Sequence, residues 1–357
     1  MEMVSLSQNQ TTTMSRTLLS QISEIVAVDI DCMDPEVAKR HNASTASPFF
    51  TDMTSNQAIV SGEAVRPERA ALLQEAIDEV KAKQSTDSPS FAQDVLDVFT
   101  VLLGKELYPY LKGNVLVQTS PPAAFDVQKT ITHAKKLVEL FEAKGISKNR
   151  VCIKIPTTAE GVVACAELQK EGIQTLATCL FNVPQALAAH QAKCVYVTPY
   201  FNELRVHFEP TIWREFAVPG KEHPMAQVIF DIKAVFGKIG SKTKVMPASV
   251  VTAREVIGLV SLHPDHITIP GGILDKLAAL PAVSPSDFEP TLTASASVSA
   301  STASELISED YLASKGSLLR EKLVADVEAA RKLDDALKLF DEFERKTKEY
   351  VLKIAVL

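Results

Sequence analysis

One lysine occupies an unusual position in this sequence. Lys154 lies in the run RVCIKIPTTAEG, residues 150–161, where isoleucines on both sides predict a buried β-strand over 151–155. Lysine is almost never fully buried unless it is paired or used. Burial lowers the pKa of the amine, and a free amine can attack a carbonyl carbon and form a Schiff base. The alternative is a lysine that Asp29 or Asp31 neutralises inside the core.

Amine chemistry of this kind needs neighbouring groups that move protons and bind the substrate. Polar residues end most of the other predicted strands, and Lys154 is the only cation among them. The other candidates are Asp29, Asp31, Asn56, Gln118, Thr178, Thr198, Tyr200 and Ser249. These strand ends contain no histidine pair and no cluster of three carboxylates, so we expect no metal site. We expect His133, His190 and His207 to be surface or structural histidines.

Eight short apolar runs, most of them followed by a helical pattern, predict the elements that position these residues. The runs cover 24–31, 48–54, 114–119, 151–155, 174–180, 194–199, 243–249 and 266–270. Strands that alternate with helices indicate an α/β fold, and eight of them predict a (β/α)8 TIM barrel with its active site at the C-terminal strand ends. An open doubly wound sheet is the alternative, but it would have a glycine-rich loop after the first strand. DCMDPE stands there instead.

Composition divides the chain into four parts. We expect a disordered polar lead over 1–20, the barrel over 21–283, a loop rich in serine and alanine over 284–305, and C-terminal helices packed on the barrel over 306–357. The charged helical pattern of 317–354 carries no feature of a DNA-binding helix.

Charge and cysteine content exclude several classes of partner. The chain has 357 residues and a formal net charge of −7, which argues against nucleic acid and anionic membranes as partners. No apolar run reaches the roughly 18 residues that span a bilayer. The five cysteines form no CxxC pair, which favours free thiols in a reducing, cytoplasmic compartment. A small-molecule substrate is therefore expected.

Four stretches of the sequence are similar to one enzyme family. The run IKIPTTAEGVVACAELQKEGIQTLATCLFNVPQALAAHQAKCVYVTPYFNEL, 153–204, closely resembles the transaldolase family, including its fructose-6-phosphate aldolase branch. DCMD at 31–34 resembles the Asp-x-x-Asp end of that family's first strand, and DMTSNQAI at 52–59 resembles its segment after the second. The helix over 124–155 matches the one that leads into the lysine strand. The resemblance covers most of the chain from about residue 24.

This resemblance implies a (β/α)8 barrel and a class I mechanism that uses no metal or organic cofactor. By the same match Lys154 is the Schiff-base lysine, and Asp31 assists proton transfer, with Asp29 as its substitute. Asn56 aligns with an asparagine that binds a hydroxyl of the donor. Thr178 aligns with a threonine that holds the catalytic water, and Ser249 with a serine of the substrate pocket. The family often forms dimers, and the charged C-terminal helices are compatible with a homodimer.

Four positions depart from transaldolase itself. Gln118 stands where that branch has a glutamate acid/base, and the aldolase branch resembles this sequence there and at Tyr200. Tyr200 is thus the expected acid/base, with Gln118 and Thr178 positioning a water. Glu203 and Val251 stand where the family has phosphate-binding arginines. Because a glutamate repels phosphate, the natural substrate is expected to lack a phosphate. If the substrate does carry a phosphate, Arg205, Lys242 or Arg254 would have to bind it in place of the missing arginines.

Two other functions stay open at this point. One is a Schiff-base lyase or dehydratase, or an enzyme that forms C–N bonds through the same iminium. The other is a metabolite-binding barrel without catalysis. The favoured hypothesis is a transaldolase-like enzyme that makes or breaks C–C bonds of ketose- and aldose-type substrates, on which Lys154 acts as nucleophile.

Overall fold

A barrel of eight parallel strands forms the centre of the molecule. The computed structural model describes residues 16–42, 47–292 and 300–356. The strands lie in the order β7-β6-β5-β4-β3-β2-β1-β8. They are β1 (Ala27–Asp31), β2 (Met53–Thr54), β3 (Val115–Gln118), β4 (Val151–Pro156), β5 (Gln174–Leu180), β6 (Tyr196–Pro199), β7 (Lys244–Val245) and β8 (His266–Pro270). The predicted (β/α)8 barrel, with its eight strands, is confirmed.

Backbone hydrogen bonds close the barrel between its two outer strands. The amide of Asp265 donates to the carbonyl of Val245 at 3.0 Å, and the amide of Thr268 donates to the carbonyl of Pro247 at 3.2 Å. β7 is shorter than the predicted run 243–249, and Pro247, which has no amide hydrogen, follows it. The sheet is therefore closed, and the C-terminal ends of its eight strands lie at one face of the barrel.

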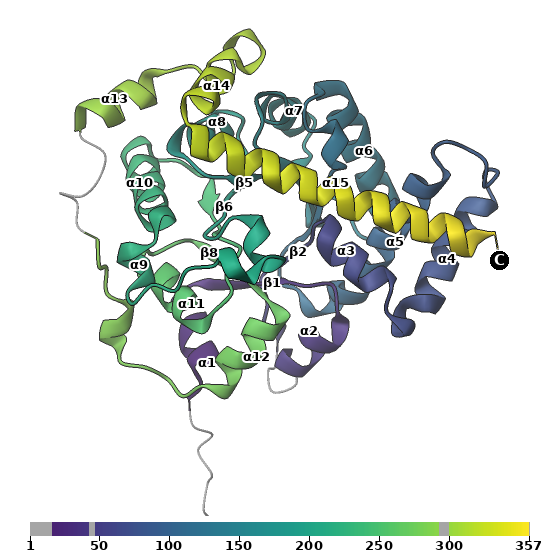
Figure 1. Ribbon diagram of the computed structural model, residues 1–357, viewed down its shortest axis with the longest axis horizontal. Coiled ribbons are helices and arrows are strands. Elements are labelled where there is room, and N and C mark those ends of the chain that lie inside the picture. Colours follow the sequence, from purple (N-terminus) through teal and green to yellow (C-terminus); the bar gives the residue numbers. More distant parts are fainter. Residues whose placement is uncertain (1–15, 43–46, 293–299, 357) are drawn as a thin grey trace, which may run out of the picture.

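Helices surround this barrel (Figure 1). They are α1 (Leu18–Ser23), α2 (Pro35–Asn42), α3 (Gln57–Ala64), α4 (Ala70–Lys81), α5 (Phe91–Leu107), α6 (Val127–Ala143), α7 (Ala159–Lys170), α8 (Val183–Gln191), α9 (Pro219–Glu222), α10 (Pro224–Ile239), α11 (Ala253–Val260), α12 (Gly271–Ala279), α13 (Ala300–Ser308), α14 (Ala313–Ala325) and α15 (Val327–Ala355). No helix within the described ranges combines the length and the apolar character that crossing a bilayer requires.

Side chains inside the barrel form an apolar layer beneath a polar one. The apolar layer is a separate buried cluster of Leu116, Cys152, Leu176, Tyr196 and Met246. Side chains in a strand alternate between its two faces, so residues two positions further on point inward again. These are Gln118, Lys154, Thr178, Thr198 and Ala248. The strand period thus places Lys154 inside the barrel, one step nearer to the C-terminal face than the apolar layer.

The last helix, α15, runs across the barrel face at which the strands end (Figure 1). It packs against α3, α5, β5 and two short 3-10 helices, η3 (Pro121–Ala123) and η5 (Leu204–His207). Three hydrogen bonds join it to residues that follow β3, β5 and β6: Ser120 to Glu344 at 2.7 Å, Asn182 to Asp326 at 3.0 Å, and Arg331 to Glu203 at 2.6 Å. The C-terminal helix therefore borders the expected active-site face.

Two boundaries differ from the division made on composition. Helix α1 begins within the segment expected as a disordered lead, because Leu18 and Ile22 are buried and the amide of Leu18 donates to the carbonyl of Leu280 at 2.9 Å. Residues 1–15 lie outside the described residues. Helix α13 begins within the expected loop 284–305, of which 293–299 also lie outside the described residues.

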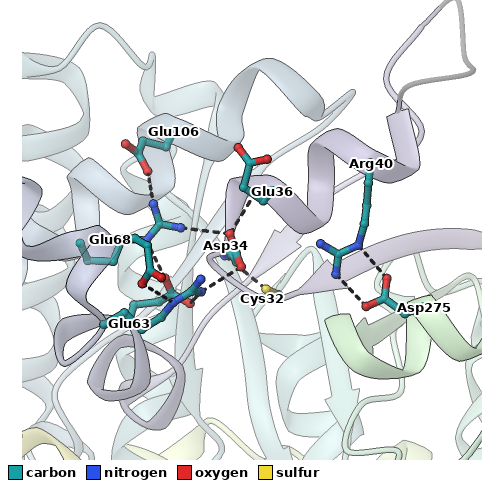
Figure 2. Close-up of polar contacts among 10 residues, drawn as sticks. Cys32, Asp34, Glu36, Arg40, Glu63, Glu68, Glu106 and Asp275 are labelled. Carbon is teal, nitrogen blue, oxygen red and sulfur yellow. Dashed lines mark hydrogen bonds and ion pairs between the residues drawn. The ribbon is translucent and has the colours of Figure 1, made fainter.

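An ion-pair network fixes the segment after β1 to the helices that follow β2 (Figure 2). Arg69 donates to three carboxylates: Glu63 at 2.7 Å, Glu106 at 3.0 Å and Asp34 at 3.1 Å. Arg66 donates to Asp34 and Glu63, each at 2.9 Å. Burial alone would raise the pKa of Asp34, but the bonds from Arg66 and the amide of Glu36 hold it below its usual value. Because Asp34 belongs to the DCMD segment, this network fixes the chain just after Asp31.

We predict that Arg69→Met lowers the free energy of unfolding by about 3 kcal/mol, because Glu63 and Asp34 lose a buried cation. The loss falls at the low end of the range for buried pairs, since Arg66 still contacts both carboxylates. Urea denaturation measures it. Lys39→Met is the matched control, since Lys39 and its partner Glu36 are both exposed, and should change stability by less than about 0.5 kcal/mol. Equal effects of the two variants would contradict this account.

Candidate active site

Lys154 is buried without a carboxylate partner. Its side chain is 2% exposed, and Nζ donates to the carbonyl of Ser55 at 3.4 Å. No carboxylate of the described residues forms an ion pair with this nitrogen, so neutralisation by direct contact with Asp29 or Asp31 does not occur. Burial lowers the pKa of Lys154, and the more distant charge of Asp31 only partly opposes that shift. A larger fraction of the amine is therefore free at neutral pH than in an exposed lysine.

Tyr200 and Thr178 lie beside this amine and contact each other. The hydroxyl of Thr178 donates to the phenol oxygen of Tyr200 at 3.2 Å, and the ring centroid of Tyr200 is 5.8 Å from Nζ of Lys154. Burial raises the pKa of Tyr200 well above its ordinary value. The phenol is therefore protonated and can act as a proton donor at this position.

Strand β5 has a bulge at Cys179, directly after Thr178. The register of β5 against β6 shifts between Ala177 and Leu180, and Cys179 has a φ of 54°, in the left-handed region. Gln185 holds this distortion from α8: its Nε2 donates to the carbonyls of Cys179 at 3.2 Å and Thr157 at 3.0 Å. Its Oε1 accepts from the amide of Phe181, two residues after Cys179, at 2.8 Å. Bulges are common beside active sites, where they redirect a side chain.

Asp31 and Asn56 line a cavity of about 250 Å3, which we call the inner cavity, together with Tyr200, whose ring lies beside Lys154. Asp31 accepts a hydrogen bond from Thr54 at 2.6 Å, and Thr54 contacts Thr268 at 2.7 Å. The Oδ1 of Asn56 caps α3 by accepting from the amides of Ala58 and Ile59, both at 3.0 Å. That cap fixes the side chain and leaves its Nδ2 to donate to a ligand.

Gln118 and Thr198 bring unpartnered polar atoms to the same region. The Nε2 of Gln118 donates to Gln57 at 2.7 Å, while its Oε1 has no partner among the described residues. The hydroxyl of Thr198 is likewise buried and unpartnered in the described structure. Gln118 and Asn56 also line a separate cavity of about 20 Å3, which has room for about one water.

Ser249 lies shortly after β7, has a strained backbone conformation and contacts His207. Its φ is 66°, and its carbonyl accepts from both the backbone and the side-chain amide of Asn202, at 3.1 and 2.9 Å. The hydroxyl lies 2.9 Å from Nε2 of His207. Burial lowers the pKa of His207, so its ring is neutral at pH 7. Non-glycine residues in this region of backbone space cluster at functional sites.

His207 is the site residue that the sequence reasoning missed. It lies in η5, seven residues after Tyr200, and nothing local marks it, because its place depends on the way η5 folds back over the barrel mouth. The inner cavity has no lysine or arginine in its lining, and His207 is its one basic residue. The two arginines that could have replaced the missing phosphate-binding residues pair with other side chains: Arg205 with Glu209 at 2.8 Å, and Arg254 with Glu215 at 3.2 Å.

Asp29 lies away from this group of residues. It contacts His266 at 3.0 Å and accepts from the amide of Asp52 at 2.9 Å, at the other end of the barrel interior. Burial raises the pKa of Asp29 to about 7, although the bond to His266 opposes that shift. Asp29 therefore has no position from which to bind a substrate in the inner cavity.

Asp29, Asp52 and His266 are close enough together to hold a metal ion. The surroundings do not suit one. Nζ of Lys244 lies 3.3 Å from Nε2 of His266. Burial lowers the pKa of His266, but the hydrogen bond and charge of Asp29 outweigh it and raise that pKa above its ordinary value. The protonated ring that this favours has no free nitrogen lone pair for a metal.

Comparison with known proteins identifies the family of this barrel. A family model described as Transaldolase/Fructose-6-phosphate aldolase matches residues 28–354. The chain belongs to the transaldolase family. The family is a group of class I aldolases and transferases, so the protein is an enzyme of that group. Within it, the suspected fructose-6-phosphate aldolase branch rests on Gln118 and Tyr200 alone.

Similar proteins named transaldolase come from distant organisms. The transaldolase of Methylobacillus flagellatus is 29% identical over 262 residues, which are 73% of this chain and 79% of that protein. The one from Nostoc punctiforme is 29% identical over 288 residues, 80% of this chain and 83% of its own. The one from Saccharomyces cerevisiae is 31% identical over 227 residues, 63% and 66% of the two chains.

One departure from the transaldolase pattern has a physical explanation in the structure. Glu203, which stands where the resemblance expects an arginine, accepts a hydrogen bond from Arg331 of α15. Arg331 also binds Asp335 at 2.9 Å and Glu328 at 3.0 Å. In a phosphate site, an arginine on this barrel loop would bind an anionic ligand. Here the loop supplies the anion, Glu203, and α15 supplies the cation, Arg331.

We predict that Gln185→Leu destabilises the fold by about 3 kcal/mol, because one amide and two carbonyls of the buried backbone lose their partner. Urea denaturation measures the loss. Gln74→Leu serves as the control: Gln74 is exposed on α4, and its side chain bonds to Asp78 alone among the described residues, so its removal should have almost no effect. If Gln185→Leu matched this control, the β5 bulge would not depend on Gln185.

Proposed function

We propose that this transaldolase-like enzyme makes and breaks C–C bonds through a Schiff base on Lys154, with substrates that carry no phosphate. The observation that supports it most strongly is the buried amine of Lys154, which has a lowered pKa and no carboxylate partner. An amine that is desolvated in this way is the nucleophile that carbonyl chemistry needs.

The steps follow from the groups around that amine. Nζ of Lys154 adds to a ketone carbonyl, and loss of water leaves a protonated iminium. The electrons of the adjacent C–C bond then move toward the iminium nitrogen, which gives an enamine. The hydroxyl on the departing carbon loses its proton and becomes an aldehyde. The enamine next adds to a second aldehyde or takes up a proton, which restores an iminium. Water then hydrolyses this iminium, which releases the ketone product and returns the free amine of Lys154.

Tyr200 is the proposed acid/base for these steps. Its raised pKa keeps the phenol protonated, so it first donates a proton toward the departing water. The resulting phenolate then accepts the proton of the substrate hydroxyl. Asp31 assists from the opposite wall of the inner cavity, and Gln118 and Thr178 position a water. Asn56, Ser249 and Thr198 are the proposed substrate-binding residues.

The absence of a phosphate follows from charge. The lining of the inner cavity offers no arginine or lysine, and the nearest replacement, His207, is neutral at pH 7 because burial lowers its pKa. Glu203 is negative. A phosphate without a cation would lose most of the charge-assisted hydrogen bonds that normally hold it.

Borohydride trapping tests the Schiff base. Incubation with dihydroxyacetone and borohydride should add one reduced adduct, which peptide mass mapping assigns to Lys154. Lys154→Met should show no adduct and should lose C–C bond activity by at least about 1,000-fold, since the covalent route is gone. An adduct on another lysine in the wild type, or no adduct with any ketone, would overturn the proposal.

Substrate charge is tested by restoring a cation. The wild type should prefer fructose to fructose 6-phosphate in cleavage. Val251→Arg should lower KM for fructose 6-phosphate by about tenfold, roughly the effect of one charge-assisted contact. Val324→Arg adds the same charge at an exposed position of α14 and should leave KM unchanged. A wild type that already prefers the phosphorylated sugar would contradict the phosphate-free assignment.

A further inference from the structure

A second cavity adjoins the inner cavity. It measures about 450 Å3, and we call it the outer cavity. His207 and Pro270 line both cavities, so they form the boundary that the two cavities share. The other walls of the outer cavity are mainly apolar side chains, which include Val206, Pro210, Trp213, Val251 and Ile273.

We propose that the outer cavity binds the apolar tail of the aldehyde that this enzyme adds or releases. The inference rests on the proposed function and extends it to a substrate class: aldehydes whose chain beyond the reacting carbon is aliphatic or aromatic rather than hydroxylated and phosphorylated.

The direction of the substrate follows from the position of the amine. Lys154 holds the donor carbonyl beside Tyr200, which lines the inner cavity. The aldehyde carbon bonds to the donor, so the remainder of its chain points away from Lys154. His207 and Pro270 line the inner cavity and border the outer cavity as well, so a chain that extends past them enters the outer cavity.

The lining selects the chemistry of that chain. Val251, at the position where the resemblance expects an arginine, gives the outer cavity an apolar wall. Polar hydroxyl groups would lose water there and gain few hydrogen bonds, whereas methylene groups gain from burial. Lys276 is the one charged residue in the lining, and it lies on the exposed surface of α12. The volume exceeds the roughly 150 Å3 that accommodates benzene in a protein core.

Affinity should therefore rise with chain length. Burial of one methylene group corresponds to roughly a fourfold gain in kcat/KM. With dihydroxyacetone as donor, kcat/KM should increase from propanal to hexanal by about that factor for each added carbon. Glyceraldehyde should react less efficiently than butanal.

A variant that fills the outer cavity tests the site itself. Val251→Phe should reduce the ratio of kcat/KM for hexanal to that for propanal by at least about tenfold, because Val251 lines the outer cavity and not the inner cavity. Val251→Leu should give a smaller reduction of the same ratio, which keeps the test valid if the larger side chain disturbs folding. Val324→Phe, the same change at an exposed position, should leave the ratio unaltered.

Borohydride trapping of dihydroxyacetone, run on each variant, separates the two levels of the proposal. If Lys154 is trapped but the chain-length profile is flat, or if Val251→Phe keeps the wild-type ratio, the outer cavity does not bind the tail and the Schiff-base function stands. If no ketone is trapped on Lys154, both proposals are overturned. Trapping with a rising profile that Val251→Phe abolishes is the expected result.

Discussion

The desolvation of one amine is the constraint on which the site depends. Lys154 points into a barrel whose next layer down is apolar, and the groups around it are hydroxyls and amides rather than carboxylates. A carboxylate in contact would stabilise the ammonium and remove the nucleophile. Asp31 is close enough to influence the pKa of Lys154 but not to pair with it. The neutral Gln118 preserves the same condition, since a glutamate at that position would add a second charge near the amine.

Three charged residues near the barrel mouth, Glu203, Arg205 and Arg331, are paired with other side chains rather than left for a ligand. Glu203 binds Arg331, Arg205 binds Glu209, and the basic residue that lines the inner cavity is a neutral histidine. α15 takes part in this pairing, so a helix at the end of the chain contributes to the electrostatics of a site built from β1 to β7. The proposed catalytic centre is therefore bordered by a mostly apolar outer cavity rather than by phosphate-binding arginines.

The sequence predicted the barrel and the lysine because both depend on local pattern. The strand period of two puts Lys154 inside once β4 is recognised, and alternation of strands with helices implies the closed sheet. The same period could not separate Asp29 from Asp31: both point inward, and only their depth, set by contact with His266 or Thr54, distinguishes them. His207 and the Gln185 bulge depend on contacts between separate elements, which no local pattern records. The start of α13 was missed because its sequence is as rich in serine and alanine as the loop before it.

The most direct measurement of the central claim is the pKa of Lys154 itself. Lysine labelled with carbon-13 at the ε position can be titrated by NMR, and Lys154→Met assigns the resonance. Desolvation predicts a pKa for Lys154 clearly below the ordinary value of 10.5. A pKa at or above that value would mean that the ammonium is stabilised in the barrel, and it would contradict the account of Lys154 as a free amine.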